Sequence, residues 1–339
     1  MNSGILSIWS EFGLCAVLIA VAGSRLSRYG DVIAEKTGLG GTWIGLILLA
    51  TVTSLPELVT GASAVTLAAA PNIAIGDALG SCVFNLVILV VMDLAARGDS
   101  IYARASQAHL LSAAFGVILI GFVGFSILLH RDGVQWSVFH VGLYTPILVI
   151  LYAVAMRTVF RYEKAQRAQL AEAAAARYPE ITLRRAVAGY AIAASVVIAA
   201  GIWLPFIGVQ MAEAMGWQRS FVGTIFVAFA TSVPELVVTL SALRLGALDM
   251  AISNLLGSNL FDVLIIAIDD VLYSQGPILE HVSTVQAVTA ISAVIMTGVV
   301  MVGVFYRARA RLLHTAGWIS VFLFAMYLLN TYIQFIRGQ

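Results

Sequence analysis

Charged residues are scarce in this chain of 339 residues. Only 11% of its residues are charged and 60% are hydrophobic, whereas soluble domains carry about 25% charged and about 45–50% apolar residues. This deficit of charge excludes an ordinary soluble protein, and the abundance of apolar residues excludes a disordered one. The formal net charge is +1 and the chain has no basic stripe, so no nucleic-acid partner is expected.

Cysteine and recognisable catalytic motifs are also nearly absent. The two cysteines, Cys15 and Cys82, lie in apolar runs, which excludes a disulfide framework or a cysteine metal cluster. No basic segment precedes the first apolar run, since the first Lys or Arg is Arg25, and a cleavable signal peptide is therefore not expected. No nucleophile–base pair, dinucleotide motif or phosphate-binding loop is found. We expect neither an enzyme nor an organic cofactor, and no protein partner is implied.

What the chain has instead is a series of long charge-poor runs. About 20 apolar residues suffice to cross a bilayer as a helix, and we count ten runs of this kind. Pro56 interrupts the second, which predicts a kinked or two-part helix. The sequence thus predicts an all-α membrane protein of about ten transmembrane helices, with the lipid bilayer as its surroundings. The runs fall near residues 5–24, 41–70, 72–95, 107–129, 134–156, 186–211, 220–243, 250–268, 282–306 and 312–336.

Lys and Arg are distributed unevenly between the connections. Those after the odd-numbered spans carry 16, and the other side carries 3. The positive-inside rule then predicts both termini outside and residues 157–185 in the cytoplasm. This Ala-rich segment is helix-prone, and we interpret it as a solvated linker, with a regulatory or lipid-headgroup helix as the alternative. Arg outnumbers Lys by 17 to 2, which, with the lack of a regulatory domain, favours a bacterial inner membrane.

The chain contains an internal repeat. Residues 50–60, ATVTSLPELVT, match residues 228–238, AFATSVPELVV, and residues 79–85, LGSCVFN, match residues 256–262, LGSNLFD. The copies lie five spans apart and so have opposite orientations, as in secondary transporters that bind ions at the midplane between inverted repeats. We predict two five-helix inverted-topology repeats, 1–156 and 186–339, joined by the linker 157–185.

Each copy places a carboxylate near the middle of a span. Glu57 and Glu235 there require a partner, a proton or a cation. The proline before each removes a backbone N–H, so freed carbonyls near Ala50 and Ala228 become candidate ligands. The set contains only oxygen ligands, which suits hard cations such as Ca²⁺ or Na⁺. The other candidates are Thr53, Ser54, Thr231 and Ser232 of the first motif, and Ser81, Asn85, Ser258 and Asp262 of the second.

The charge of this set is suited to ion exchange. Glu57, Glu235 and Asp262 carry −3 when ionised; three Na⁺ would neutralise them, whereas one Ca²⁺ would leave −1 or require a proton. Competition of this kind predicts an antiporter that exchanges Na⁺ for Ca²⁺. The alternative is exchange of H⁺ for Ca²⁺, or of another divalent cation, because burial favours the protonated form of a Glu side chain.

The two blocks resemble the alpha-repeats of the sodium/calcium exchanger family, within the calcium/cation antiporter superfamily, over residues 41–95 and 219–270. The resemblance implies that the Thr, Ser and Glu of the first motif and the Ser and Asn/Asp of the second line the ion sites. It also implies carbonyl ligands at Ala50 and Ala228, and alternating access in which the first and sixth spans slide across a fixed core. Val52, Ala230 and Cys82 depart from the usual residues of the family, which bears on helix packing and ion choice but not on the class.

Several other polar residues occur in or near the spans. Asp77 and Asn254 take near-equivalent places early in two spans, and we interpret them as network or entrance residues. Asp93, Asp269 and Asp270 lie near span ends, where we expect interfacial positions. We expect the five histidines to be interfacial rather than proton relays. They are His109, His130, His140, His281 and His314.

Overall fold

The computed structural model describes residues 2–37, 52–96, 99–131, 137–167, 180–308, 311–312 and 316–337. In this part of the chain eight helices are long and apolar enough to cross a membrane, and a bent pair, Arg219–Thr231 with Val233–Arg244, makes a ninth. The predicted span 41–70 is represented by its second part, α3. Its first part, with Ala50, lies outside the described residues, as does much of the linker.

The helices of the two halves correspond in order and length. In the first half they are α1 (Asn2–Lys36), α3 (Leu55–Thr66), α4 (Pro71–Ala95), the short α5 (Ile101–Arg104), α6 (His109–Arg131) and α7 (Tyr144–Arg167). In the second they are α8 (Leu183–Met215), α9 (Arg219–Val222), the π-helical η1 (Gly223–Val227), α10 (Ala228–Thr231), α11 (Val233–Arg244), α12 (Leu248–Leu272), the 3₁₀-helical η2 (Ile278–Glu280), α13 (Val285–Tyr306) and α14 (Trp318–Arg337). Both α3 and α11 have 12 residues, and both α4 and α12 have 25.

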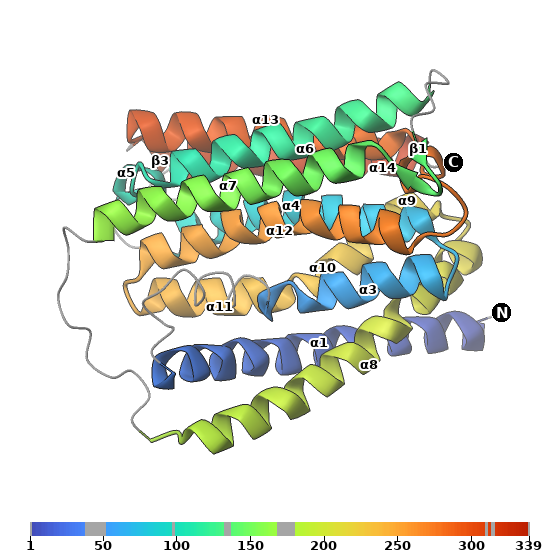
Figure 1. Ribbon diagram of the computed structural model, residues 1–339, viewed down its shortest axis with the longest axis horizontal. Coiled ribbons are helices and arrows are strands. Elements are labelled where there is room, and N and C mark those ends of the chain that lie inside the picture. Colours follow the sequence, from blue (N-terminus) through green and yellow to red (C-terminus); the bar gives the residue numbers. More distant parts are fainter. Residues whose placement is uncertain are drawn as a thin grey trace.

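The repeats interlock around α4 and α12, the two most buried of the candidate spans. These helices pack against each other, with α6, α7, α13 and α14 on one side and α3, α10 and α11 on the other. The long helices α1 and α8 lie side by side along the free side of α3 and α11 (Figure 1). Both chain ends lie at the same end of the bundle, as an even number of crossings requires. The predicted ten-helix fold with inverted repeats is confirmed.

Two buried aspartates fasten each repeat to the last helix of the other. Asp93, near the end of α4, accepts hydrogen bonds from Gly317 N (3.0 Å) and Ser320 Oγ (2.8 Å) at the start of α14. Asp270, near the end of α12, accepts them from Gly142 N (2.9 Å) and from the Thr145 hydroxyl at the start of α7. Both aspartates lie near helix ends, and each is buried because it accepts hydrogen bonds from backbone and hydroxyl donors of a neighbouring segment.

The same hydrogen bonds explain why two helices begin several residues after the predicted starts of their spans. The runs starting near 134 and 312 open with two-stranded antiparallel hairpins, and the helices start only at Tyr144 and Trp318. The hairpins are β1 (Ser137–Val138) with β2 (Val141–Gly142), and β3 (Arg311–Leu312) with β4 (Ala316–Gly317). Each hairpin ends in the glycine whose N–H reaches the aspartate of the opposite repeat.

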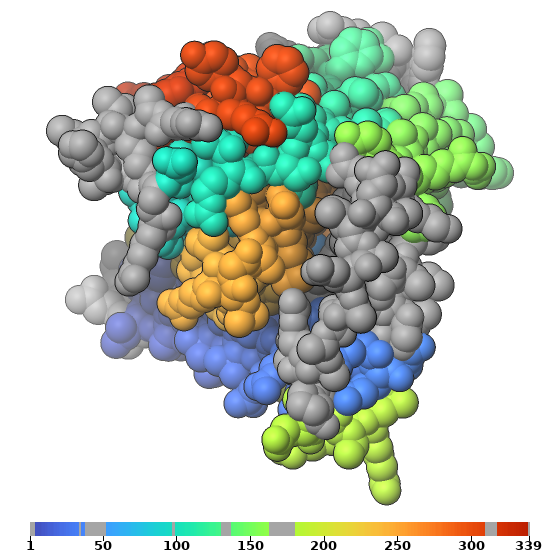
Figure 2. Space-filling view, turned by 90° about the vertical axis from the view of Figure 1, so that its left-hand side faces the viewer, coloured from blue at the N-terminus to red at the C-terminus, as the bar shows by residue number. Residues whose placement is uncertain are grey.

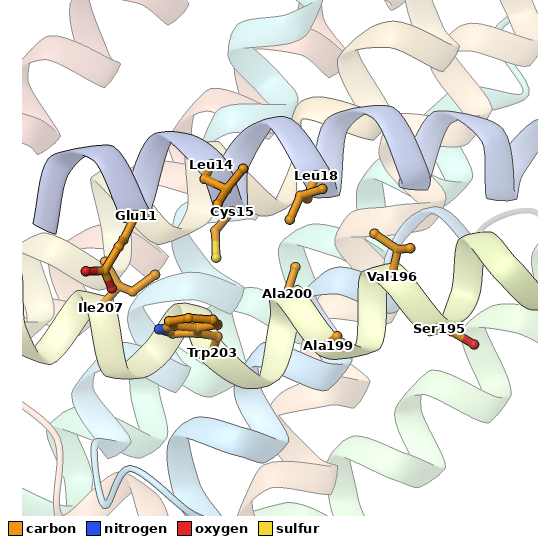
Figure 3. A pocket seen from close by; sticks show the side chains of 10 residues that line it. All are labelled: Glu11, Leu14, Cys15, Leu18, Ser195, Val196, Ala199, Ala200, Trp203 and Ile207. Atoms are coloured by element: carbon orange, nitrogen blue, oxygen red, sulfur yellow. The ribbon is translucent and has the colours of Figure 1, made fainter. Parts of the chain in front are cut away.

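Helices α1 and α8 leave a groove between them over part of their length. Between the two helices lies an apolar groove of about 440 Å³, with Leu14 and Cys15 of α1 facing Ala200 and Trp203 of α8 (Figure 3). Glu11 also lines this groove. A second small core cluster joins the pair further along, formed by Ala22, Leu26, Val52, Ala193 and Val197. The interface is therefore built from small and apolar side chains.

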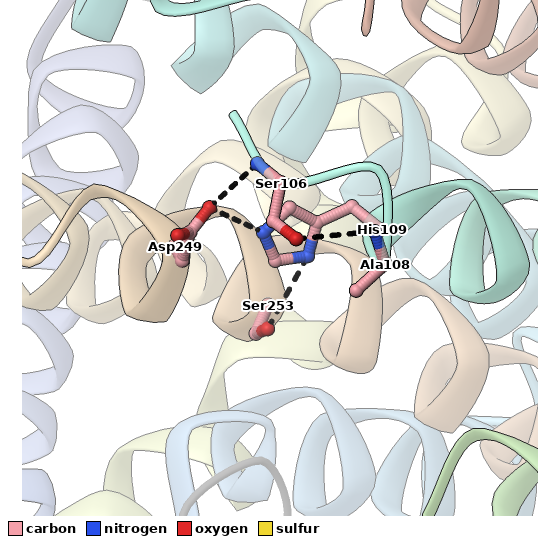
Figure 4. A network of polar contacts seen from close by, with 5 residues as sticks. All are labelled: Ser106, Ala108, His109, Asp249 and Ser253. Atoms are coloured by element: carbon pink, nitrogen blue, oxygen red, sulfur yellow. Dashed lines mark hydrogen bonds and ion pairs between the residues drawn. The ribbon is translucent and has the colours of Figure 1, made fainter. Parts of the chain in front are cut away.

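A histidine–aspartate pair joins α6 to α12 at the predicted cytoplasmic end. Figure 2 looks onto this end, where the orange α11–α12 connection lies between α1 and the segment that leads into α6. Asp249 Oδ1 lies 2.9 Å from His109 Nε2 and accepts a hydrogen bond from Ser106 N, while Ser253 Oγ lies 3.4 Å from the other ring nitrogen (Figure 4). His109 is buried and fixes this contact between repeats, at a helix start and away from the acidic centre.

Candidate cation site

The first motif of each repeat breaks a helix and opens a new one. Ser54 and Ser232 leave helical geometry at the break, with φ and ψ of −91° and 16° and of −87° and 4°. A proline follows within the first two residues of α3 and of α11, where an N–H would have no partner within the helix that begins there. Glu57 and Glu235 thereby lie in the first turn of their helices, where the helix dipole favours an ionised carboxylate.

A glycine in the second motif brings α4 against the broken helix. A Cβ carbon at Gly80 would lie 2.4 Å from Thr224 O of η1 and 2.8 Å from Ala228 Cβ of α10. Only a residue without a side chain fits there, so Gly80 permits the close contact between α4 and the broken helix. The π-helical turn η1 directly precedes the motif, and π-bulges are frequent at functional sites.

This approach brings hydroxyl groups of both repeats together. Ser232 Oγ lies 3.0 Å from Ser81 Oγ and 3.3 Å from Glu57 Oε1. Thr53 Oγ1 lies 3.4 Å from Ser258 Oγ. The Ser232–Ser81 and Thr53–Ser258 contacts join the first motif of one repeat to the second motif of the other, and the Ser232–Glu57 contact joins the two first motifs.

The three predicted carboxylates are buried and incompletely paired. Among the described residues, Glu57 Oε2, Asp262 Oδ1 and both carboxylate oxygens of Glu235 lack a hydrogen-bond partner of normal geometry. The hydroxyl of Thr53 and the backbone N–H of Glu235 itself approach this carboxylate without a hydrogen bond of normal geometry. A buried carboxylate in this condition requires a cation or a proton. No three His, Cys, Asp or Glu side chains of the described segments converge as a ready metal cluster, so hydroxyl and carbonyl oxygens would complete any coordination shell.

The second motifs cross at their middle through an amide network. Asn85 Nδ2 donates to Asn259 Oδ1 (2.9 Å), and Asn259 Nδ2 donates to Cys82 O (3.2 Å). Cys82 Sγ lies 3.7 Å from Asp262 Oδ2. Sequence reasoning did not assign Asn259 a role in orienting Asn85, although the repeat aligns Asn259 with Cys82. The network leaves Asn85 Oδ1 without a partner in the described structure.

Asp77 belongs to the same acidic cluster. Its Oδ1 lies 2.9 Å from Thr231 Oγ1, and its Oδ2 is unpaired within the described residues. Its charge interacts with those of Glu57 and Asp262. Asp77 is therefore part of the central hydrogen-bond network, as one of the two predicted roles requires. With Asp77, the cluster contains four carboxylates rather than the three counted from the motifs.

The predicted carbonyl ligands are represented by Ala228 alone. Its oxygen accepts the N–H of Ser232 at 3.0 Å and lies 3.2 Å from Thr231 Oγ1. That hydroxyl also lies 2.9 Å from Asp77 Oδ1, and when it donates there, one lone pair of the Ala228 oxygen is left for a cation. Pro234, having no N–H, deprives the carbonyl of Ala230, four residues earlier, of its helical donor. The structure thus adds Ala230 to the carbonyls available at the break, while Ala50 lies outside the described residues.

A membrane bundle of two inverted repeats with buried, oxygen-rich side chains at their crossing is the architecture of a transporter of inorganic cations, and not of an enzyme. The chain belongs to the sodium/calcium exchanger protein family: the sequence model of that family matches residues 7–160 and 185–336. The membership confirms the resemblance of the two motifs, and with it a cation antiporter of the calcium-exchanger type.

Individual relatives agree with this assignment. The uncharacterized membrane protein MJ0091 of Methanocaldococcus jannaschii is 27% identical over 68% of this chain and 70% of its own length. The fold is similar to that of native YfkE, with a TM-score of 0.66, 19% identity and coverage of 96% of this chain and 92% of that one. It is also similar to the sodium-calcium exchanger NCX_Mj soaked with Na⁺ and Sr²⁺, with a TM-score of 0.60, 20% identity and coverage of 97% and 98%.

Proposed function

We propose that this protein exchanges Na⁺ for Ca²⁺ across the membrane by alternating access. The observation that carries the proposal is the central set of unpaired oxygens, from Glu57, Glu235, Asp262 and Asn85. They come from four helical segments and both repeats, and they include carboxylates that need compensating positive charge. Hard cations prefer such oxygen ligands. NCX_Mj, which has a similar fold, is described as a sodium-calcium exchanger.

The ion sites are proposed at the residues of the two motifs. Thr53, Ser54 and Glu57 would line them with their counterparts in the second repeat, together with Ala50 and Ala228 through carbonyl oxygens. Competition follows from charge, because three Na⁺ bring one positive charge more than one Ca²⁺, and the cluster cannot balance both loads equally. Each ion then favours the conformation that it binds more tightly, which couples the two fluxes to one motion.

The moving part is proposed to be the α1–α8 pair. These helices pack on α3 and α11 from one side, apart from the interlocked core of α4 and α12. Sliding of this pair would open the centre to one end of the bundle and then to the other. We further infer that the repeats divide at residues 157–185, that both termini face outside, and that the membrane is a bacterial inner membrane.

The direct test is ⁴⁵Ca²⁺ uptake by proteoliposomes that contain the purified protein. Vesicles loaded with Na⁺ and diluted into Na⁺-free medium should accumulate Ca²⁺, and vesicles loaded with K⁺ should not. Glu57→Gln and Glu235→Gln keep the side-chain size but remove a charge that the bound cation balances. Each should abolish uptake while the protein still elutes as a folded species.

Proton loading separates the two coupling hypotheses. If an outward proton gradient drives Ca²⁺ uptake in the absence of Na⁺, the coupling ion is H⁺ and not Na⁺. Uptake at the wild-type rate in either glutamine variant would show that the corresponding glutamate is not an ion ligand. Vesicles that take up no Ca²⁺ under a Na⁺, K⁺ or proton gradient would contradict the proposal as a whole.

A further inference from the structure

Asp269 is a buried carboxylate that the central site does not use. It lies near the end of α12, its exposed fraction is 0%, and neither of its oxygens has a hydrogen-bond partner among the described residues. Its neighbour Asp270, by contrast, accepts four hydrogen bonds. Although Asp269 lies near a helix end, its carboxylate has neither solvent nor donors among the described residues to compensate its charge.

Asp269 continues the face of α12 that carries Asp262. The two residues are seven positions apart, which is two helical turns and the same face. Opposite them on α3, Glu57 and Gly61 are four positions apart and likewise share a face. A Cβ carbon at Gly61 would lie 2.5 Å from Asp269 Oδ2 and 2.9 Å from Oδ1, so the carboxylate fills the space that the glycine leaves.

Asp77 links this position to the centre. Its charge interacts with that of Glu57 and with that of Asp269, and its Oδ2 is unpaired in the described structure. Asp77 is therefore within electrostatic range of both Glu57 and Asp269, and Asp269 lies toward the end of the bundle where α3 and α12 end. The charged connections predict that this end is extracellular.

The equivalent positions in the other half of the bundle carry no carboxylates. The repeat offsets of 177 and 178 place Met92 at the position equivalent to Asp269, Asn254 at that of Asp77, and Thr239 at that of Gly61. Asn254 and Thr239 are neutral and lie within 3.5 Å of each other. The two carboxylates, Asp269 and Asp77, thus correspond to a methionine and an amide in the other repeat. The two halves of the bundle therefore differ in charge at these positions.

We propose that Asp269, together with Asp77, forms a further cation-binding position in the predicted outer half, which Na⁺ or Ca²⁺ occupies between the outer solution and the central site. The proposal rests on the proposed antiport for its place in the ion pathway. Its ligands are carboxylate oxygens that the protein leaves unpaired, and hard cations prefer such ligands. Because the inner half has no counterpart, the effect of this position is confined to one side of the membrane.

The first test measures binding without transport. Thermal unfolding of the purified protein is followed in cation-free buffer and in separate titrations with Ca²⁺ and Na⁺. Asp269→Asn keeps the shape and removes an uncompensated charge, so its cation-free Tm should rise and its stabilisation by Ca²⁺ or Na⁺ should shrink. The ion whose titration changes is the occupant. Unchanged titrations with both ions would overturn the proposal.

The second test measures affinity from each side in right-side-out and inside-out vesicles. Asp269→Asn should raise the half-saturating Ca²⁺ concentration about tenfold at the outer face, equivalent to about 1.4 kcal/mol, and leave the inner face unchanged. Gly61→Ala keeps the charge but displaces the carboxylate, and should act in the same direction. Met92→Leu, at the equivalent inner position, is the matched control and should behave as wild type.

The outcomes separate this proposal from the proposed function. An equal loss of affinity at both faces, or none at either, overturns the outer position while exchange by the wild type stands. Absence of exchange in the wild type contradicts the antiport itself, and the thermal titrations then decide whether Asp269 binds a cation.

Discussion

Gly23 of α1 lies directly against the ring of Pro234 of α11: a Cβ carbon at Gly23 would stand 2.5 Å from Pro234 Cγ. Gly201 of α8, 178 residues later, lies in the same way against Val59 of α3, with 3.0 Å to its Cγ1. Each helix of the proposed moving pair therefore crosses a motif helix of the other repeat at a glycine. A helix that slides needs such smooth contacts, because a protruding side chain would lock its register.

We expect Gly23→Ala to slow exchange about tenfold, since overpacking costs about 1–3 kcal/mol and a proline ring cannot move aside. Gly201→Ala should have a smaller effect in the same direction, because Val59 can shift. Gly30→Ala is the control on α1, where the nearest atom would be 3.6 Å away. Initial rates of ⁴⁵Ca²⁺ uptake at saturating Ca²⁺ measure the effect, and equal rates for Gly23→Ala and Gly30→Ala would contradict a sliding contact at Gly23.

The aspartates that fasten the two repeats should govern stability. Asp270→Asn replaces one charged acceptor by an amide, whose NH₂ then faces donors such as Gly142 N. A hydrogen bond to a charged group contributes about 1.5–3 kcal/mol, so we expect a clear fall in Tm for Asp270→Asn and for Asp93→Asn. Glu213→Gln is the control, since its exposed carboxylate pairs with Arg219 at 3.3 Å. A Tm equal to wild type for both aspartate variants would show that these bonds are dispensable.

The orientation can be tested at two described loops. In a variant with Cys15 and Cys82 replaced, a single cysteine at Leu245, which is 69% exposed at the end of α11, should react with a membrane-impermeant maleimide only from the cytoplasmic side. A single cysteine at Met215, at the end of α8, should react from outside. The reverse pattern in intact cells would invert the predicted topology, because both positions follow from one count of positive charges.

The central motifs could be predicted from the sequence because their residues are repeated. Glu57 and Glu235 stand in matched contexts, and a duplicated carboxylate in an apolar run has few structural explanations. Asp93, Asp269 and Asp270 were not predictable in this way. All three lie near helix ends, and distance from a helix end does not reveal whether a neighbouring repeat covers that end.

The fastening aspartates did leave a signal in the sequence. Gly142 and Thr145 recur 175 residues later as Gly317 and Ser320, which are the donors to the two aspartates. A glycine followed three residues later by a hydroxyl is too short a pattern to recognise alone. Only the structure shows that each pair meets the aspartate of the opposite repeat, since the hairpin geometry brings the backbone N–H and the hydroxyl to one carboxylate.

The two repeats differ at one predicted ligand, which is Asn85 in the first and Asp262 in the second. If three Na⁺ and one Ca²⁺ compete for the cluster, the Na⁺-bound state carries one more positive charge than the Ca²⁺-bound state. Removing one carboxylate therefore penalises Na⁺ binding more, because the attraction that is lost is proportional to the charge of the bound ions. We predict that Asp262→Asn loses Na⁺/Ca²⁺ exchange to a greater extent than Ca²⁺/Ca²⁺ exchange, with both fluxes measured in the same vesicle preparation.

The double variant Asn85→Asp with Asp262→Asn separates charge from ligand position. It restores the number of carboxylates and moves one of them to the symmetry-equivalent place, where the Asn259 amide network already holds the side chain at 2.9 Å. If charge sets the coupling, the double variant should recover Na⁺/Ca²⁺ exchange relative to Asp262→Asn alone. Equal loss of both flux modes in Asp262→Asn, without recovery in the double variant, would instead make Asp262 a position-specific Ca²⁺ ligand. Full retention of both modes in Asp262→Asn would remove this residue from the ion site.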